Sequence, residues 1–157
     1  MSITIGPEDP AEPEIRALID DLDRLMVSLY PAESNHLLDI ETLRGPDIKF
    51  FVARYDDVAV GCGAYRVLDA SLGQRGHGEI KRMFVTPVAR GMRLGHRLLV
   101  HLEIDAMVAG LRRLSLETGI HQPAAIGLYT RAGYQPCPPF GEYKEDPLSL
   151  FMTKTIG

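Results

Sequence analysis

The stretch from Glu79 to Arg97, which reads EIKRMFVTPVARGMRLGHR, narrows the possible folds of this chain more than any other. Its first part, residues 79–86, is rich in residues that favour strands and ends at Pro87. From Gly91 to Ala109, apolar residues then recur every four positions, which predicts a helix that stops at Gly110. A strand that passes through a tight loop into a helix indicates a mixed α/β architecture.

The N-terminal quarter carries the signals of a helix start. Asp9, Pro10 and Glu12 match an N-cap, a first-turn proline and a capping-box carboxylate. Apolar residues then recur at helical spacing as far as Tyr30, where Pro31 is expected to end the helix. The other predicted elements are strand 2–5, a short helix within 32–44, strands 48–55 and 58–68 joined as a hairpin by two aspartates, strand 111–118, helix 123–132, strand 134–136 and strand 148–155.

Length and composition limit the classes of protein. The 157 residues predict one domain, residues 1–157, and the net charge of −4 argues against a nucleic-acid binder, which needs a surplus of cations. No basic, apolar leader and no run of about 18 apolar residues is present, so neither export nor a membrane partner is expected. Two cysteines without metal or disulfide spacing point to the cytoplasm. A homodimer, the commonest soluble oligomer, stays open.

The loop before the central helix has the features of an anion site. A helix N-terminus offers unpaired backbone N–H groups and a partial positive charge, on which a pyrophosphate can sit. Gly91 and Gly95 would leave room for it, and Arg90, Arg93 and Arg97 would add charged donors. The alternative is a tight turn beside a basic, solvated surface.

Two segments resemble motifs of the GNAT superfamily of N-acetyltransferases. Residues 90–95, RGMRLG, are similar to its acyl-CoA loop, Arg/Gln-x-x-Gly-x-Gly/Ala, with Arg93 in place of the middle glycine. Residues 122–134, QPAAIGLYTRAGY, are similar to Asn-x-x-Ala-x-x-Leu-Tyr-x-x-x-Gly-Phe, with Gln122 in place of asparagine. The resemblance implies an α/β (α+β) fold with a mixed, mostly antiparallel sheet, split at its centre and flanked by helices, with acetyl-CoA in the split.

The resemblance also implies an activity, the transfer of the acetyl group of acetyl-CoA to an amine of a small molecule or a protein. Tyr129 would protonate the leaving thiolate, unless it is an ordinary packed aromatic. Glu79 would accept the amine proton, unless it is a surface glutamate, with Glu117, His77 and His121 as substitutes. The expected contacts to the cofactor are Phe84, Val85, Arg90, Gly91, Met92, Arg93, Leu94, Gly95, His96, Gln122 and Tyr129.

The acceptor pocket is expected between two irregular segments, because loops on a rigid scaffold commonly set specificity. The residues expected there are Glu33, Asn35, His36, Glu117, Phe140, Glu142 and Tyr143; the alternative is a solvated loop. The five histidines are scattered, so no metal site is expected. The competing function is a non-catalytic acyl-CoA-binding or regulatory domain.

Overall fold

The computed structural model describes residues 2–35, 39–68 and 76–157. One seven-stranded sheet runs through it in the order β1-β2-β3-β4-β5-β7-β6. The strands are β1 (Ile3–Pro7), β2 (Ile48–Tyr55), β3 (Val58–Val67), β4 (His77–Val85), β5 (Arg113–Gly119), β6 (Gln135–Pro136) and β7 (Ser149–Thr155). The helices are α1 (Pro13–Leu29), α2 (Ile40–Leu43), α3 (Leu94–Val108) and α4 (Pro123–Arg131), with 3₁₀ turns η1 (Ala32–Ser34) and η3 (Pro87–Ala89).

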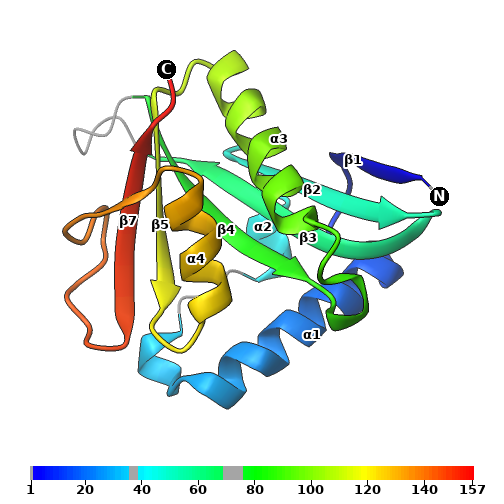
Figure 1. The fold of residues 1–157 in the computed structure, drawn as a ribbon, viewed down its shortest axis with the longest axis horizontal. Helices are drawn as coiled ribbons and strands as arrows, with labels where there is room; N and C mark the ends of the chain where they lie inside the picture. The colour runs from blue at the N-terminus through cyan, green and yellow to red at the C-terminus, as the bar shows by residue number, and fades with distance from the viewer. Residues whose placement is uncertain (1, 36–38, 69–75) are drawn as a thin grey trace.

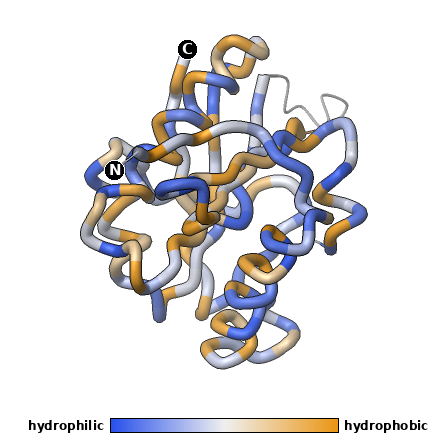
Figure 2. The backbone as a smooth tube through the Cα atoms, turned by 90° about the vertical axis from the view of Figure 1, so that its right-hand side faces the viewer, coloured by the Kyte–Doolittle hydropathy of each residue, from blue (hydrophilic) through white to orange (hydrophobic). Residues whose placement is uncertain are grey.

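The two faces of the sheet carry different helices. Figure 1 shows α3 and α4 lying across one face, and α1 packs on the opposite face against β3 and β4. Along the tube in Figure 2, hydrophobic and hydrophilic stretches alternate, as expected of elements that bury one side only. The core under α3 and α4 includes Ile80, Leu98, Leu102, Leu114 and Leu116, and the core under α1 includes Ile15, Ile19, Val52 and Phe84.

Local sequence signals account for most of these elements. The hairpin of β2 and β3 is confirmed, with Asp56 and Asp57 at φ of 47° and 70° in the turn, as a two-residue hairpin loop requires. The predicted start of α1 is wrong: the helix begins at Pro13, because Asp9 accepts from the Ala11 N–H in a turn of its own. The central helix was also expected to begin too early, since it starts at Leu94 rather than Gly91.

The predicted split of the sheet is confirmed and lies between β4 and β5. These strands are parallel neighbours for four pairs only, His77↔Arg113 to Ile80↔Leu116. Beyond this junction they diverge, as Figure 1 shows. The remaining strand pairs are antiparallel, which makes the sheet mixed but mostly antiparallel.

A β-bulge in β4 begins at Arg82, two residues beyond the last pair with β5. Opposite Gly63, the strand carries one extra residue, and Arg82 takes a left-handed backbone conformation at φ 60°. Such a conformation costs an L-residue about 1–2 kcal/mol. The buried Arg82 guanidinium pairs with Asp23 of α1, and this pairing holds the bent strand against the helix. The bulge thereby turns β4 away from β5 and opens the split.

Candidate active site

A large cleft of about 680 Å³ follows the split from β4 to the start of α3. The N-cap of α3 makes no side-chain hydrogen bond, so the first N–H groups of this helix stay available to a ligand. Three exposed arginines, Arg90, Arg93 and Arg131, line the same cleft. Of the residues expected to contact the cofactor, it is lined by Phe84, Val85, Arg90, Gly91, Arg93, Leu94, Gly95, His96, Gln122 and Tyr129.

The loop that leads into α3 differs in detail from its predicted form. Gly91 has a φ of 92°, and an added Cβ there would meet no atom within 4 Å. Arg93 adopts the left-handed conformation, φ 58°, at the position where the motif has glycine. Gly95 serves close packing as well as access, because a Cβ on it would lie 3.2 Å from Leu128 of α4.

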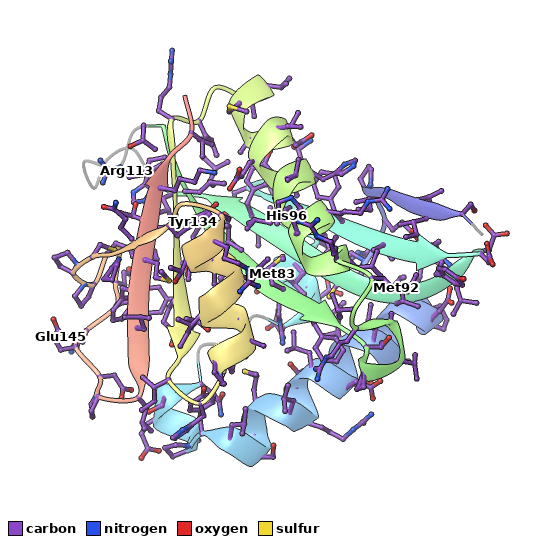
Figure 3. The ribbon with its side chains drawn as sticks, viewed as in Figure 1. Met83, Met92, His96, Arg113, Tyr134 and Glu145 are labelled. Carbon is purple, nitrogen blue, oxygen red and sulfur yellow. The ribbon has the colours of Figure 1, made fainter. Side chains whose placement is uncertain are left out.

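Met92 is the one expected cofactor contact of this loop that does not line the cleft. Its side chain packs against Val60, Ala89 and Leu94. Met83 of β4, in contrast, lies in the wall of the cleft. Figure 3 shows these two methionines on opposite sides of the first turn of α3.

A second, smaller pocket of about 100 Å³ opens next to the cleft. Its polar wall comes from segments far apart in the chain: Tyr30, Ser34, Asn35, Lys81 and Glu117. Five residues line both spaces, namely Leu22, Met83, Gln122, Ala125 and Tyr129. The two cavities therefore adjoin each other along these five residues.

Tyr129 stands at this meeting point. Its side chain is 5% exposed, and its ring meets Tyr134 edge-on at 5.8 Å. Burial raises the pKa of its hydroxyl, and the nearby Glu117 carboxylate raises that pKa further. The phenol is therefore protonated at neutral pH and can donate a proton or a hydrogen bond.

Glu79, the first candidate for the base, lines neither of these two cavities. It is 4% exposed and accepts a hydrogen bond from Tyr143, and the Lys81 ammonium lies 3.5 Å from its carboxylate. Lys81 also donates to the Tyr143 hydroxyl at 2.9 Å and lines the smaller pocket. Glu79 thus belongs to a buried polar cluster behind the pocket wall.

Glu117 does line the smaller pocket. It projects from β5, and its carboxylate accepts from the Ser149 hydroxyl at 2.8 Å. The other substitutes for the base lie elsewhere. His77 contacts Ser115 at 2.6 Å, and burial, followed by Arg113, lowers its pKa. His121 is exposed and lines the large cleft.

The residues expected to bind the acceptor divide into three groups. Asn35 and Glu117 line the smaller pocket. Tyr143 does not line it, but its hydroxyl accepts from Lys81, which does. Phe140 packs against Tyr143 and Phe151 instead. The exposed side chains of Glu33 and Glu142 line neither cavity, and His36 lies outside the described residues.

Sequence reasoning missed several residues of the site. Tyr30 was assigned to the end of a helix, yet its hydroxyl reaches across the split to residues 121 and 122. Arg131 falls inside the second motif at a position the motif leaves open, although a cation near a phosphate site was a usable signal. Lys81 could have been found from its place two residues after Glu79 on the same strand face.

Within residues 2–35, 39–68 and 76–157, no three metal-ligating side chains of His, Cys, Asp or Glu gather into a group that could hold an ion. In the same ranges, no helix has the length and apolar character needed to cross a bilayer.

The fold and the site together define an acyl-CoA-dependent acyltransferase. The sheet is opened by a bulge, and a long cleft ends on an uncapped helix start with three arginines. A tyrosine lies between this cleft and a second pocket. More particularly, the chain belongs to the Acetyltransferase (GNAT) family, whose model matches residues 15–134.

Individual relatives agree with this assignment. A protein of Azospirillum brasilense named IAA acetyltransferase is 50% identical over 155 residues, which make up 99% of each chain. The crystal structure of a Klebsiella pneumoniae protein, described as an acyl-CoA N-acyltransferase, has a TM-score of 0.81 at 39% identity, and the match covers 99% of this chain and 98% of that one. A Salmonella typhimurium structure with acetyl-CoA shares the fold, with a TM-score of 0.75 at 20% identity over 100% of this chain and 95% of that one.

Proposed function

We propose that the chain transfers the acetyl group of acetyl-CoA to an amine that occupies the smaller pocket, by direct attack within a ternary complex. The observation that carries this proposal is the position of Tyr129 in the walls of both cavities. A thioester in the large cleft would there face an amine in the small pocket, as an attack without a covalent enzyme intermediate requires.

The large cleft fits acetyl-CoA in three ways. Its volume of about 680 Å³ is in the range of small-molecule sites. The first turn of α3 with Arg90, Arg93 and Arg131 would hold the phosphates. The apolar residues Leu25, Leu29 and Leu128 would line the path of the arm. Acetyl-CoA bound in the Salmonella typhimurium structure supports the same cofactor here.

The chemistry needs an acceptor for one proton and a donor for another. The amine nitrogen forms a bond to the carbonyl carbon and loses a proton, while the carbon–sulfur bond breaks and the thiolate gains one. We assign the donor to Tyr129, whose raised pKa keeps it protonated. A backbone N–H of β4 near Phe84 or Val85 would polarise the carbonyl oxygen.

We assign the acceptor of the amine proton to Glu117 rather than Glu79. Glu117 lines the pocket in which the amine would sit, whereas Glu79 is buried behind Lys81 and Tyr143. A general base must come within hydrogen-bond reach of the proton, directly or through one water. Glu79 would meet this condition only by relay through its two partners.

The pocket favours a small acceptor over a protein. A space of about 100 Å³ is smaller than an engineered cavity of about 150 Å³ that binds benzene, so it takes only a small group. The Ser34 hydroxyl donates to Asp146 at 2.7 Å and ties η1 to the segment before β7 at one side of it. We therefore propose a small-molecule amine as the acceptor. The two cysteines without disulfide spacing support the cytoplasm as the compartment of the reaction.

The test is release of free thiol from acetyl-CoA across a panel of small amines and lysine-containing peptides, with products identified by mass. Turnover with small amines well above that with peptides is the expected result. Binding of acetyl-CoA without turnover on any acceptor would instead indicate a non-catalytic acyl-CoA-binding domain.

A further inference from the structure

Tyr30, directly after the last residue of α1, lies against the end of β5 on the far side of the split. Its side chain is 7% exposed, and its ring stacks on His121 with centroids 5.5 Å apart. Gly119 makes room for it, because a Cβ at that position would lie 1.8 Å from the Tyr30 hydroxyl oxygen. Gly119 has no positive φ, so the glycine is required by the tyrosine and not by the backbone.

The Tyr30 hydroxyl joins a small network at the start of α4. It accepts from the His121 backbone N–H at 3.1 Å and donates to Oε1 of Gln122 at 3.4 Å. The same Oε1 accepts from the backbone N–H of Gly119 at 3.2 Å. Two donors, the Tyr30 hydroxyl just after α1 and the Gly119 N–H of β5, therefore hold one end of the Gln122 carboxamide.

This network fixes which way the carboxamide faces. A backbone N–H can only donate, so the atom opposite Gly119 must be the oxygen. The NH₂ group then points the other way, and none of the described residues accepts from it. Gln122 lines both cavities, so this NH₂ is a donor available to a carbonyl oxygen in the cleft.

We propose that Tyr30 is a positioning residue for the cofactor: it holds Gln122 so that the carboxamide NH₂ donates to an amide carbonyl of the pantetheine arm. The inference rests on the proposed function, since the arm is that of acetyl-CoA. Tyr30 also lines the smaller pocket. The hydrogen-bonded pair of Tyr30 and Gln122 therefore borders both the acceptor and the cofactor.

The first experiment measures the dissociation constant of coenzyme A by calorimetry for Tyr30→Phe, Gln122→Ala and the double variant. Each single change should weaken binding about three- to tenfold, the size of one ordinary hydrogen bond. The double variant should bind no more weakly than Gln122→Ala alone, because Tyr30 acts through Gln122. Wild-type affinity in Tyr30→Phe, or additive effects in the double variant, would overturn the proposal.

The matched control is Tyr65→Phe, which removes the hydroxyl of another buried tyrosine whose partner is Asp105, at 2.6 Å and away from both cavities. It should leave coenzyme A affinity unchanged. If the wild-type chain bound no coenzyme A, the proposed function would fail; if it bound normally and Tyr30→Phe did too, only the role of Tyr30 would fail.

A second experiment uses the room at Gly119. Gly119→Ala should displace the Tyr30 ring and weaken coenzyme A binding at least as much as Tyr30→Phe does. In a Tyr30→Ala background, where the space is free, the same alanine should add no further loss. Thermal unfolding of all four proteins reports whether each is folded. An equal loss from Gly119→Ala in both backgrounds would contradict the proposal.

Discussion

The large cleft and the small pocket are built in different ways, although they share a wall. The cleft forms its anion site largely from backbone, namely a bulged strand, a loop with positive φ and a helix start within residues 82–96, to which Arg90, Arg93 and Arg131 add charge. The small pocket is made of side chains from α1, η1, β4, β5 and α4, which meet only in the folded chain. Backbone groups stay in place when side chains change, whereas a substitution in a side-chain pocket can change which ligand it binds. The cofactor should therefore be the fixed partner and the acceptor the variable one.

The sharpest test of the boundary between the two regions is Tyr129→Phe. The ring and its packing stay, but the proton donor is lost, so turnover should fall about 10²–10⁴-fold. Affinity for acetyl-CoA should change little, because the hydroxyl acts mainly in the transition state. Steady-state kinetics with calorimetry measures both quantities.

Tyr134→Phe is the matched control for Tyr129→Phe. Tyr134 touches the same ring, but its hydroxyl donates to Glu103 at 2.8 Å, outside both cavities. It should keep wild-type turnover. Full activity in Tyr129→Phe would remove the tyrosine from the reaction.

The two glutamates give the next largest contrast. Glu117→Gln should lower kcat about 10²-fold or more near pH 7 and converge on wild type at high pH, where the amine deprotonates without help at about pH 10. Glu79→Gln should cost less and keep the shape of the wild-type profile, because it alters only the cluster behind the pocket. Kinetics from pH 6 to pH 10 decides; the reverse pattern would return the role of base to Glu79.

An added carboxylate at the start of α3 tests the backbone site. Gly95→Glu should weaken coenzyme A binding about tenfold or more, since it places a negative charge at the anion site. Gly95→Ala separates the steric part, because its Cβ meets only the flexible end of Leu128. His96→Glu adds the charge at an exposed position without touching the glycine. If calorimetry found unchanged coenzyme A affinity in both glutamate variants, this loop would not be the phosphate site.

The smallest expected effect concerns Arg93. Glycine at this position restores the residue that the motif carries and removes a left-handed conformation that costs about 1–2 kcal/mol. Arg93→Gly should thus raise the melting temperature by a few degrees. It should also weaken coenzyme A binding a few-fold through the loss of one cation. Lower stability together with tighter binding would reverse both assignments.

Sequence patterns predicted the fold where short-range chemistry decides it. The two aspartates of the β2–β3 turn and the strand, loop and helix of residues 79–109 are local signals. The bulge at Arg82 was not predictable, because nothing local favours a left-handed arginine there; its ion pair with Asp23 spans 59 positions. The pocket was missed in part for the same reason: Tyr30 and Gln122 lie 92 residues apart.

The start of α1 shows a different limit. Asp9, Pro10 and Glu12 fit a capping pattern, but three residues further on Pro13 offers an equally good first turn. Asp9 then forms a turn of its own with Ala11. Where two capping patterns lie this close together, the burial of Ile15 and Leu18 decides which of them starts the helix. A local sequence pattern does not contain this information.

The four-pair junction between β4 and β5 also determines where the folded sheet opens in local fluctuations. It is the only ladder between the sheet's two blocks, β1 to β4 and β5 to β7, in the part of the chain that the structure describes. Amide hydrogen exchange should therefore find lower protection for the amides bonded across this junction, within residues 77–80 and 113–116, than for those bonded between β2 and β3. A ligand that contacts β4, α3 and α4 at once binds to both parts of the sheet and stabilises their contact. Coenzyme A should therefore slow amide exchange at this junction more than in the hairpins.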